Sequence, residues 1–96
     1  MALQLRVLSG RDSGRLFSLT EGRPFRIGRD MGTDTRLKDP QVAMLHCQVT
    51  AEPGRVVLTD LNSSGGTFVG AERVRVHELR QGDVFRVGDT RIRLEG

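Results

Sequence analysis

The chain has 96 residues, of which 36% are hydrophobic and 28% are charged, and its formal net charge is +3. This length fits one domain with a modest core, and the composition excludes a disordered or membrane-embedded chain. The single cysteine, Cys47, excludes an internal disulfide and is typical of a reducing compartment, and the start of the chain lacks the pattern of a signal peptide. We therefore expect a cytoplasmic protein without membrane insertion.

Short apolar segments with a period of two recur along the whole chain, separated by glycine, proline or polar residues. Such alternation predicts strands, and no segment has a sustained helical period. We therefore expect an all-β sandwich, formed by a single domain over residues 1–96 and carried as a module of a larger protein. In chain order the expected strands are LQLRVL (3–8), RLFSL (15–19), FRIG (25–28), LHCQVT (45–50), RVVLTDL (55–61), TFV (67–69), RVRV (73–76), DVFRVG (83–88) and RIRLEG (91–96).

Arginines supply nearly all of the positive charge, and most of them stand singly within these alternating segments. Alternation directs such side chains toward solvent while their apolar neighbours point inward, which indicates a solvated sheet surface. A nucleic-acid interface would also be expected to offer stacking rings, whereas the aromatic residues are four phenylalanines. A basic nucleic-acid binder is thus the last of the alternatives, and we expect no nucleic-acid partner.

Three polar segments follow or precede strands: Ile27–Asp30, Val42–His46 and Asn62–Gly66. Loops of this kind cluster at the ends of a sandwich. If they meet, Arg29 and the hydroxyls of Ser63 and Ser64 would converge with glycine-lined backbone amides. Arginine matches phosphate oxygens with a planar fork of donors, and glycine lets amides approach closely, so the set predicts a phosphate-binding site.

The same segments carry no sign of catalysis or of a metal site. His46 and Cys47 are neighbours on a strand and point to opposite faces, so they do not chelate one ion together. Ser63 or Ser64 with His46 and Asp60 has the residue types of a catalytic triad, but the nucleophile-elbow sequence and its strand–turn–helix context are missing. We therefore expect no enzyme activity, no metal and no cofactor.

In their order and spacing these pieces are a strong fold signal: "IGR", "TRLKD", the V-x-x-x-H of Val42–His46, "VVLTDLNSSGGTFV" and "GDVFRVG". The chain resembles the forkhead-associated (FHA) domain over nearly its whole length. The resemblance implies a sandwich of two mainly antiparallel sheets with binding loops at one end. It also implies a module that binds phosphothreonine-containing proteins or peptides in signalling.

Residue roles carried over from the family fall into two groups. The resemblance implies that Arg29 is the principal phosphate ligand, and that Ser63, Ser64 and Gly65 lie in the loop that contacts the phosphopeptide. Structural support of the site is implied for Gly28, which turns the backbone before Arg29, and for His46, which bonds to nearby backbone. It is also implied for Gly66 and Thr67, which shape the turn.

Two positions depart from the family pattern. Ala43 replaces a serine that donates to the phosphate, and Gly65 replaces an asparagine that grips the peptide main chain. Losing one donor to a charged group weakens binding by about one to two orders of magnitude. We therefore expect weakened or altered phosphothreonine recognition. The alternative is a degenerate FHA scaffold that makes phosphate-independent protein contacts.

Overall fold

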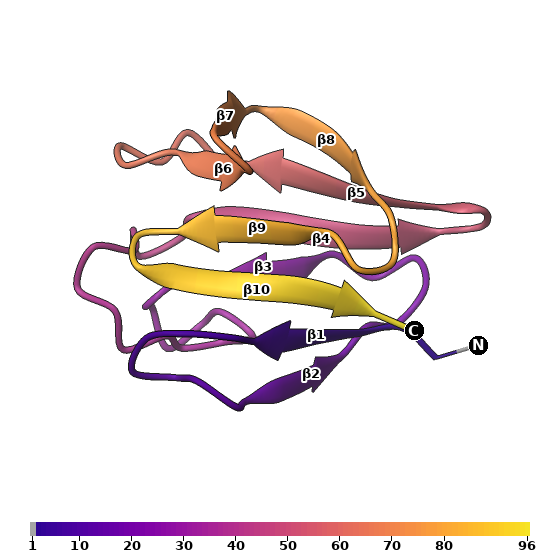
Figure 1. Cartoon of the computed structure of the whole chain (residues 1–96). Helices are drawn as coiled ribbons and strands as arrows, with labels where there is room; N and C mark the ends of the chain where they lie inside the picture. The colour runs from indigo at the N-terminus through magenta and orange to yellow at the C-terminus, as the bar shows by residue number, and fades with distance from the viewer. Residues whose placement is uncertain (1) are drawn as a thin grey trace.

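The computed structural model describes residues 2–96, which form ten strands and no helix. No helix that could cross a membrane is therefore present in this part of the chain. Figure 1 shows both termini at one end of the molecule and the long connections at the other, which we call the apex. The strands are β1 (Gln4–Val7), β2 (Leu16–Ser18), β3 (Phe25–Ile27), β4 (Cys47–Glu52), β5 (Arg55–Asp60), β6 (Thr67–Val69), β7 (Glu72–Val74), β8 (Val76–Leu79), β9 (Val84–Val87) and β10 (Thr90–Glu95).

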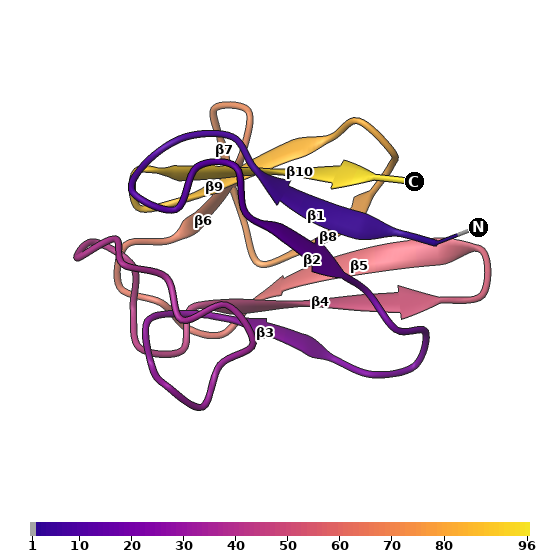
Figure 2. The same cartoon turned by 90° about the horizontal axis from the view of Figure 1, so that it is seen from below.

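The strands make two antiparallel sheets that pack face to face (Figure 2). One sheet has the order β2-β1-β10-β9-β6-β7, and the other has the order β3-β4-β5-β8. The all-β sandwich predicted from the alternating pattern is therefore confirmed. In each long strand one residue in two is buried, as in β10, where Ile92 and Leu94 are inside and Arg91 and Arg93 lie outside.

The core lies between the sheets. Its largest fully buried apolar side chains come from both layers, with Leu5, Phe85 and Ile92 from the first sheet and Ile27 and Leu58 from the second. Burying such a side chain stabilises the fold by about 1.5–3 kcal/mol. Cys47 also lies in this core, and burial raises the pKa of its thiol. It is a packing residue of the core.

One expected strand differs. The segment predicted as a single strand over 73–76 is divided between the sheets, because β7 ends at Val74 and β8 begins at Val76. The bend lies at Arg75, whose carbonyl oxygen accepts a hydrogen bond of 2.8 Å from the backbone N–H of Asp60. The chain crosses from one layer to the other here, a step that an unbroken alternating pattern does not reveal.

The long β3–β4 connection is fixed to its neighbours by two buried carboxylates. Asp39 accepts hydrogen bonds from the backbone N–H groups of Gln41 and Asp89 and from the Thr90 hydroxyl, at 2.9, 2.7 and 2.9 Å. Asp12, on the β1–β2 loop, accepts one from the backbone N–H of Lys38 at 2.7 Å. The connection is thereby held at the apex although it contains no strand between residues 28 and 46.

Candidate functional site

Two loops meet at the apex: the β3–β4 connection (28–46) and the β5–β6 loop (61–66). His46 joins them. Its Nδ1 accepts a hydrogen bond from the backbone N–H of Ala43 at 3.0 Å, and its Nε2 lies 2.8 Å from the carbonyl oxygen of Gly66. Because a carbonyl only accepts, Nε2 carries the proton and the ring is the neutral Nε2–H tautomer. A fully buried His46 thus fixes one loop against the other.

Gly28 lets the backbone before Arg29 lie against the segment that precedes β4. A Cβ atom on Gly28 would be 2.1 Å from the carbonyl oxygen of Met44, which no side chain tolerates. The N–H groups of the next two residues, Arg29 and Asp30, bond to the carbonyl oxygens of Ala43 and Met44 at 3.2 and 3.0 Å. The absence of a side chain at residue 28 therefore allows the close backbone contact that positions the main chain of Arg29.

Arg29 is exposed, and its guanidinium is held at one point. Its Nε donates to the carbonyl oxygen of Val42 at 2.5 Å. Within residues 2–96 its two Nη groups have no carboxylate partner and no hydrogen bond. An arginine fixed through Nε and open at both Nη groups keeps the donors that bind an oxyanion.

The β5–β6 loop is organised from within by Asp60. Its carboxylate accepts hydrogen bonds from the Ser63 backbone and hydroxyl, at 3.1 and 2.5 Å, and from the Thr67 hydroxyl at 2.7 Å. Burial alone would raise the pKa of Asp60, but these bonds hold it below its ordinary value. The Ser63 hydroxyl also accepts from the backbone N–H of Gly66 at 3.1 Å.

These contacts give Ser63 a role inside the loop. Its side chain is buried, and its hydroxyl donates its one proton to Asp60 and accepts from Gly66. Ser64 and Gly65 are the exposed residues of the turn. A Cβ atom on Gly65 would lie 3.7 Å from the carbonyl oxygen of Gln41, which shows that this turn reaches the β3–β4 connection.

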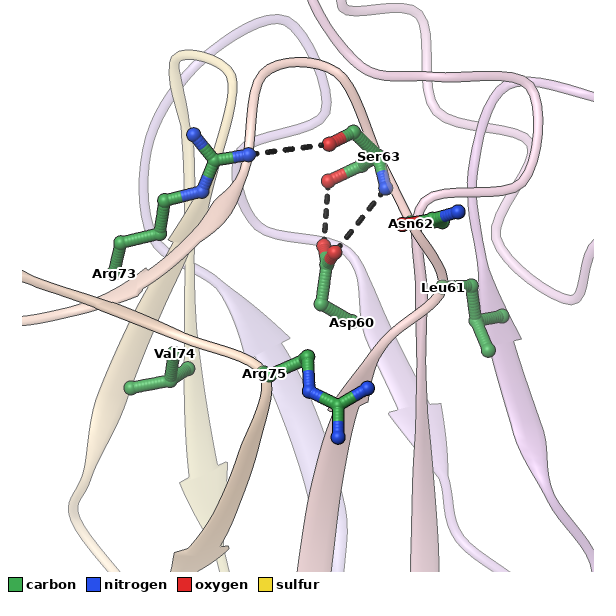
Figure 3. Close-up of a pocket in the computed structure, with 7 residues that line it drawn as sticks. All are labelled: Asp60, Leu61, Asn62, Ser63, Arg73, Val74 and Arg75. Carbon is green, nitrogen blue, oxygen red and sulfur yellow. Dashed lines mark hydrogen bonds between the residues drawn. The ribbon is translucent and has the colours of Figure 1, made fainter.

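Gly66 has a positive φ of 85°, which favours glycine, and Arg73 packs against it. A Cβ atom there would lie 2.7 Å from the Nε of Arg73. The same guanidinium donates from Nη2 to the Ser63 carbonyl oxygen at 3.3 Å (Figure 3). The sequence pattern did not identify Arg73, because its place beside the loop depends on the pairing of β7 with β6.

A hollow of about 630 Å³ lies beside this loop. The residues that line it, shown in Figure 3, are Asp60, Leu61, Asn62, Ser63, Arg73, Val74 and Arg75. Arg29 and Ser64 do not line it. Of the predicted ligands only Ser63 lines the hollow, and we do not assign the phosphate to it. Among residues 2–96 there is also no cluster of three metal-binding side chains.

Comparison with known proteins gives the family. Residues 6–96 match the family model Yop-YscD_cpl, described as "Inner membrane component of T3SS, cytoplasmic domain", which is of the FHA type. The chain belongs to this family of FHA domains. The resemblance inferred from the sequence motifs is thus confirmed, and FHA domains are interaction modules rather than enzymes.

Individual relatives of this FHA domain also carry FHA domains. It is 38% identical over 80 residues to the FHA domain-containing protein FhaA of Mycobacterium tuberculosis, a match that covers 83% of this chain and 15% of the relative. One solved structure, from a study of phosphothreonine-dependent FHA domain interactions, has 32% identity and a TM-score of 0.90, covering 100% of this chain and 97% of the other. A structure of the FhaA FHA domain complexed with the intracellular domain of another protein has 33% identity and a TM-score of 0.86, covering 97% and 99%.

The FHA domain spans 15% and 24% of the lengths of the two curated relatives that it matches. Two apical positions at which the resemblance implies polar side chains, Ala43 and Gly65, are small. Ala43 uses its backbone N–H for His46, and Gly65 leaves the tip of the β5–β6 loop without a side chain. Beside them the apolar side chains of Met44 and Leu45 are exposed, at 50% and 44%.

Proposed function

We propose that this FHA domain binds a phosphothreonine-containing segment of a partner protein at its apex. The single observation that carries the proposal is the state of Arg29, whose guanidinium is fixed through Nε to Val42 and open at both Nη groups. A structure at 32% identity belongs to a study of phosphothreonine-dependent interactions, which supports the same ligand class here.

The roles divide between the outside and the inside of the loops. Arg29 binds the phosphate oxygens, the exposed Ser64 hydroxyl donates to the same group, and the Gly65 backbone lies under the peptide. Ser63 supports the loop through Asp60 and makes no direct contact with the ligand. Gly28, His46, Gly66 and Thr67 hold the two loops in place, through the contacts described above.

The two small residues lower the affinity and relax the selectivity. A hydrogen bond to a charged group contributes about 1.5–3 kcal/mol, so the missing serine donor at Ala43 costs about tenfold to a hundredfold in affinity. Gly65 offers no amide to the peptide main chain. Binding through Arg29 and Ser64 alone is therefore weak, and a partner gains affinity from contacts outside the phosphate.

We place the domain in the cytoplasm as one module of a longer protein, without enzyme activity of its own. The family model carries a cytoplasmic description, and the curated relatives are longer than this chain. The whole protein's activity follows from neighbouring segments, which the FHA domain brings to a phosphorylated partner.

A second candidate function is phosphate-independent binding of a protein through the same apex. The observation that favours it is the group of exposed apolar side chains beside Arg29, namely Met31 at 75%, Met44 at 50% and Leu45 at 44%. These side chains would fit an apolar partner surface better than a phosphate alone.

The experiment that separates the two functions is a titration of the domain with matched peptides. A library of threonine peptides is prepared in phosphorylated and unphosphorylated forms and measured against the native domain, Arg29→Ala and the control Arg26→Ala. Arg26 is exposed on β3 and its side chain makes no hydrogen bond within the described residues. We expect binding of phosphorylated peptides only, lost in Arg29→Ala and kept in Arg26→Ala. Equal binding of both peptide forms would support the phosphate-independent function instead.

A further inference from the structure

The outer face of the six-stranded sheet carries an excess of positive charge. Side chains that point outward from its strands include five arginines and one glutamate, an excess of four, whereas the net charge of the entire chain is +3. The outer face of the four-stranded sheet has two arginines and two glutamates and is neutral: Arg26, Arg55, Glu52 and Glu78. The charged set on the first face is Arg6, Arg73, Arg86, Arg91, Arg93 and Glu95.

Part of this charge is neutralised within the sheet. Glu95 accepts hydrogen bonds from the Nε atoms of Arg6 and Arg93, at 3.0 and 2.9 Å. The hydrogen bond from Arg93, and then that from Arg6, hold the pKa of Glu95 at about 2. Arg6 and Arg93 are therefore paired with a carboxylate, whereas the other three arginines of this face have no carboxylate partner within residues 2–96.

Those three form a row across neighbouring strands at the apical part of the sheet, which we call the arginine row (Arg73, Arg86 and Arg91). Phe68 pairs with Arg73 on one side and Arg86 on the other, and Arg86 pairs with Arg91. Neighbouring strands are about 4.8 Å apart, so the row spans about 14 Å. Figure 1 shows β7, β6, β9 and β10 in this order.

The row holds like charges next to each other, and no ion pair within residues 2–96 neutralises them. Directly opposed like charges on a sheet are destabilising, and Arg86 and Arg91 are such a pair. The Arg86 guanidinium lies 4.5 Å from the centre of the Phe68 ring and donates to the carbonyl oxygen of Gly88 at 2.7 Å. Arg91 makes no side-chain hydrogen bond or ion pair with any residue from 2 to 96. An anion placed between the two would relieve the repulsion.

A small hollow lies where that anion would sit. It measures about 150 Å³ and is lined by Phe68, Gly70, Val84, Arg86 and Arg91. Gly70 leaves it open, because no atom lies within 4 Å of the place where its Cβ would be. The size fits one carboxylate side chain between two guanidinium groups, which match carboxylate geometry.

The row also joins the proposed phosphothreonine site. Arg73, its first member, donates to Ser63 and packs on Gly66 in the β5–β6 loop. A peptide that leaves Ser64 across this loop therefore reaches Arg73 first, and then Arg86 and Arg91. At about 3.3 Å per residue, an extended peptide crosses the row with about four residues.

We infer that the arginine row binds an acidic segment, rich in aspartate or glutamate, that adjoins the phosphothreonine of the partner. The inference rests on the proposed function, because that function supplies the phosphothreonine. Binding of the acidic segment itself requires only the arginine row. The charge excess and the contact with the β5–β6 loop favour an acidic peptide. A single-stranded nucleic acid would be expected to stack on free aromatic rings, and the Phe68 ring is already covered by Arg86.

The experiment uses two phosphothreonine peptides, one with a run of glutamates on the N-terminal side of the phosphothreonine and one with the run on its C-terminal side. Each has a matched peptide with glutamines in place of the glutamates. The domains are the native form, Arg86→Gln/Arg91→Gln, Arg91→Gln alone, and the control Arg26→Gln/Arg55→Gln, which removes two charges from the other sheet. Melting curves establish that each variant is folded. One glutamate peptide should bind about threefold to tenfold more tightly than its glutamine counterpart, and added salt should reduce this gain. The gain should disappear in the row variants and remain in the control.

A separate arm uses an unphosphorylated glutamate peptide, followed by NMR. Amide shifts in β6, β9 and β10 that vanish in Arg86→Gln/Arg91→Gln support the inference even if no phosphopeptide binds and the proposed function fails. Binding of glutamine and glutamate phosphopeptides with equal affinity overturns the inference and leaves the proposed function standing. An absence of shifts, or tighter binding of duplex DNA or anionic vesicles through the same arginines, also overturns it.

Discussion

The Nε2 atom of His46 lies 2.8 Å from the carbonyl oxygen of Gly66, although the two residues are twenty positions apart in the chain. This hydrogen bond joins the loop that carries Arg29 to the loop that carries Ser64. On the other side of the ring, Nδ1 accepts from Ala43. One buried side chain therefore sets the distance between the two halves of the proposed phosphate site.

We expect His46→Ala to lower the free energy of unfolding by about 2–5 kcal/mol, because two buried backbone groups lose their partner. Urea denaturation measures the change. His77→Ala is the matched control, since this half-buried histidine on β8 makes no side-chain hydrogen bond within residues 2–96. We expect it to cost less than about 1 kcal/mol. Equal losses in the two variants would contradict the joining role of His46.

Two adjacent serines should separate stability from binding. Ser63→Ala removes a buried hydroxyl that bonds to both Asp60 and Gly66, and should lower the free energy of unfolding by about 1–3 kcal/mol. Ser64→Ala changes an exposed hydroxyl and should leave stability within about 0.5 kcal/mol, while phosphopeptide affinity falls about tenfold or more. Thermal melting and calorimetric titration measure the two effects. If Ser63→Ala lowered phosphopeptide affinity and Ser64→Ala lowered stability, Ser63 would be the ligand residue and Ser64 the structural one.

Much of the fold was predictable because its residues obey local rules. Alternation identified the strands other than β7 and β8, and glycine marked the turns, as at Gly54 and Gly82, which both have positive φ. The division of residues 73–76 between the sheets was not predictable, since the crossing at Arg75 depends on which strands pair. The arginine row was not predictable for the same reason. Its members are at most 18 residues apart along the chain, and they become neighbours only through the pairing of β6 and β9.

The placement of the candidate residues was predictable in part. Arg29 was proposed from its place after "IG" and Ser64 from the polar turn; both are exposed, and their ligand roles stay predictions. The buried position of Ser63 was not predicted, because adjacent serines look alike in sequence. The spacing of Asp60, Ser63 and Thr67 was the available signal, since an aspartate readily accepts from groups a few residues ahead in a turn.

The buried carboxylate of Asp39 and the half-buried carboxylate of Asp60 should make the domain sensitive to acid. Burial tends to raise the pKa of Asp39, but hydrogen bonds from Gln41, Thr90 and Asp89 bring it below its ordinary value, and Asp60 is lowered in the same way. A carboxylate with a lowered pKa in the folded state stabilises the fold above its unfolded pKa, and this contribution is lost as the pH falls through the folded value. We therefore expect constant stability from these groups above about pH 5 and a progressive loss below about pH 4.

Urea denaturation between neutral and acid pH measures this dependence, and Asp39→Asn and Asp60→Asn should each be less stable at neutral pH and show a shallower slope in acid. A stability that rises as the pH falls below 4 would contradict the roles of both carboxylates.

The final prediction restores the two side chains that the apex lacks. Ala43→Ser adds a hydroxyl next to the segment that holds Arg29, and should raise phosphopeptide affinity about tenfold to a hundredfold. Gly65→Asn is sterically permitted, because a Cβ atom there meets only the Gln41 carbonyl oxygen, at the ordinary distance of 3.7 Å. Gly66→Asn is the matched control: its positive φ and its contact with Arg73 predict loss of stability without gain in binding. Calorimetric titration of the single and double variants decides the matter. A double variant that binds phosphothreonine no better than the native domain would show that the apex is not organised around a phosphate, and would favour contact through Met44 and Leu45.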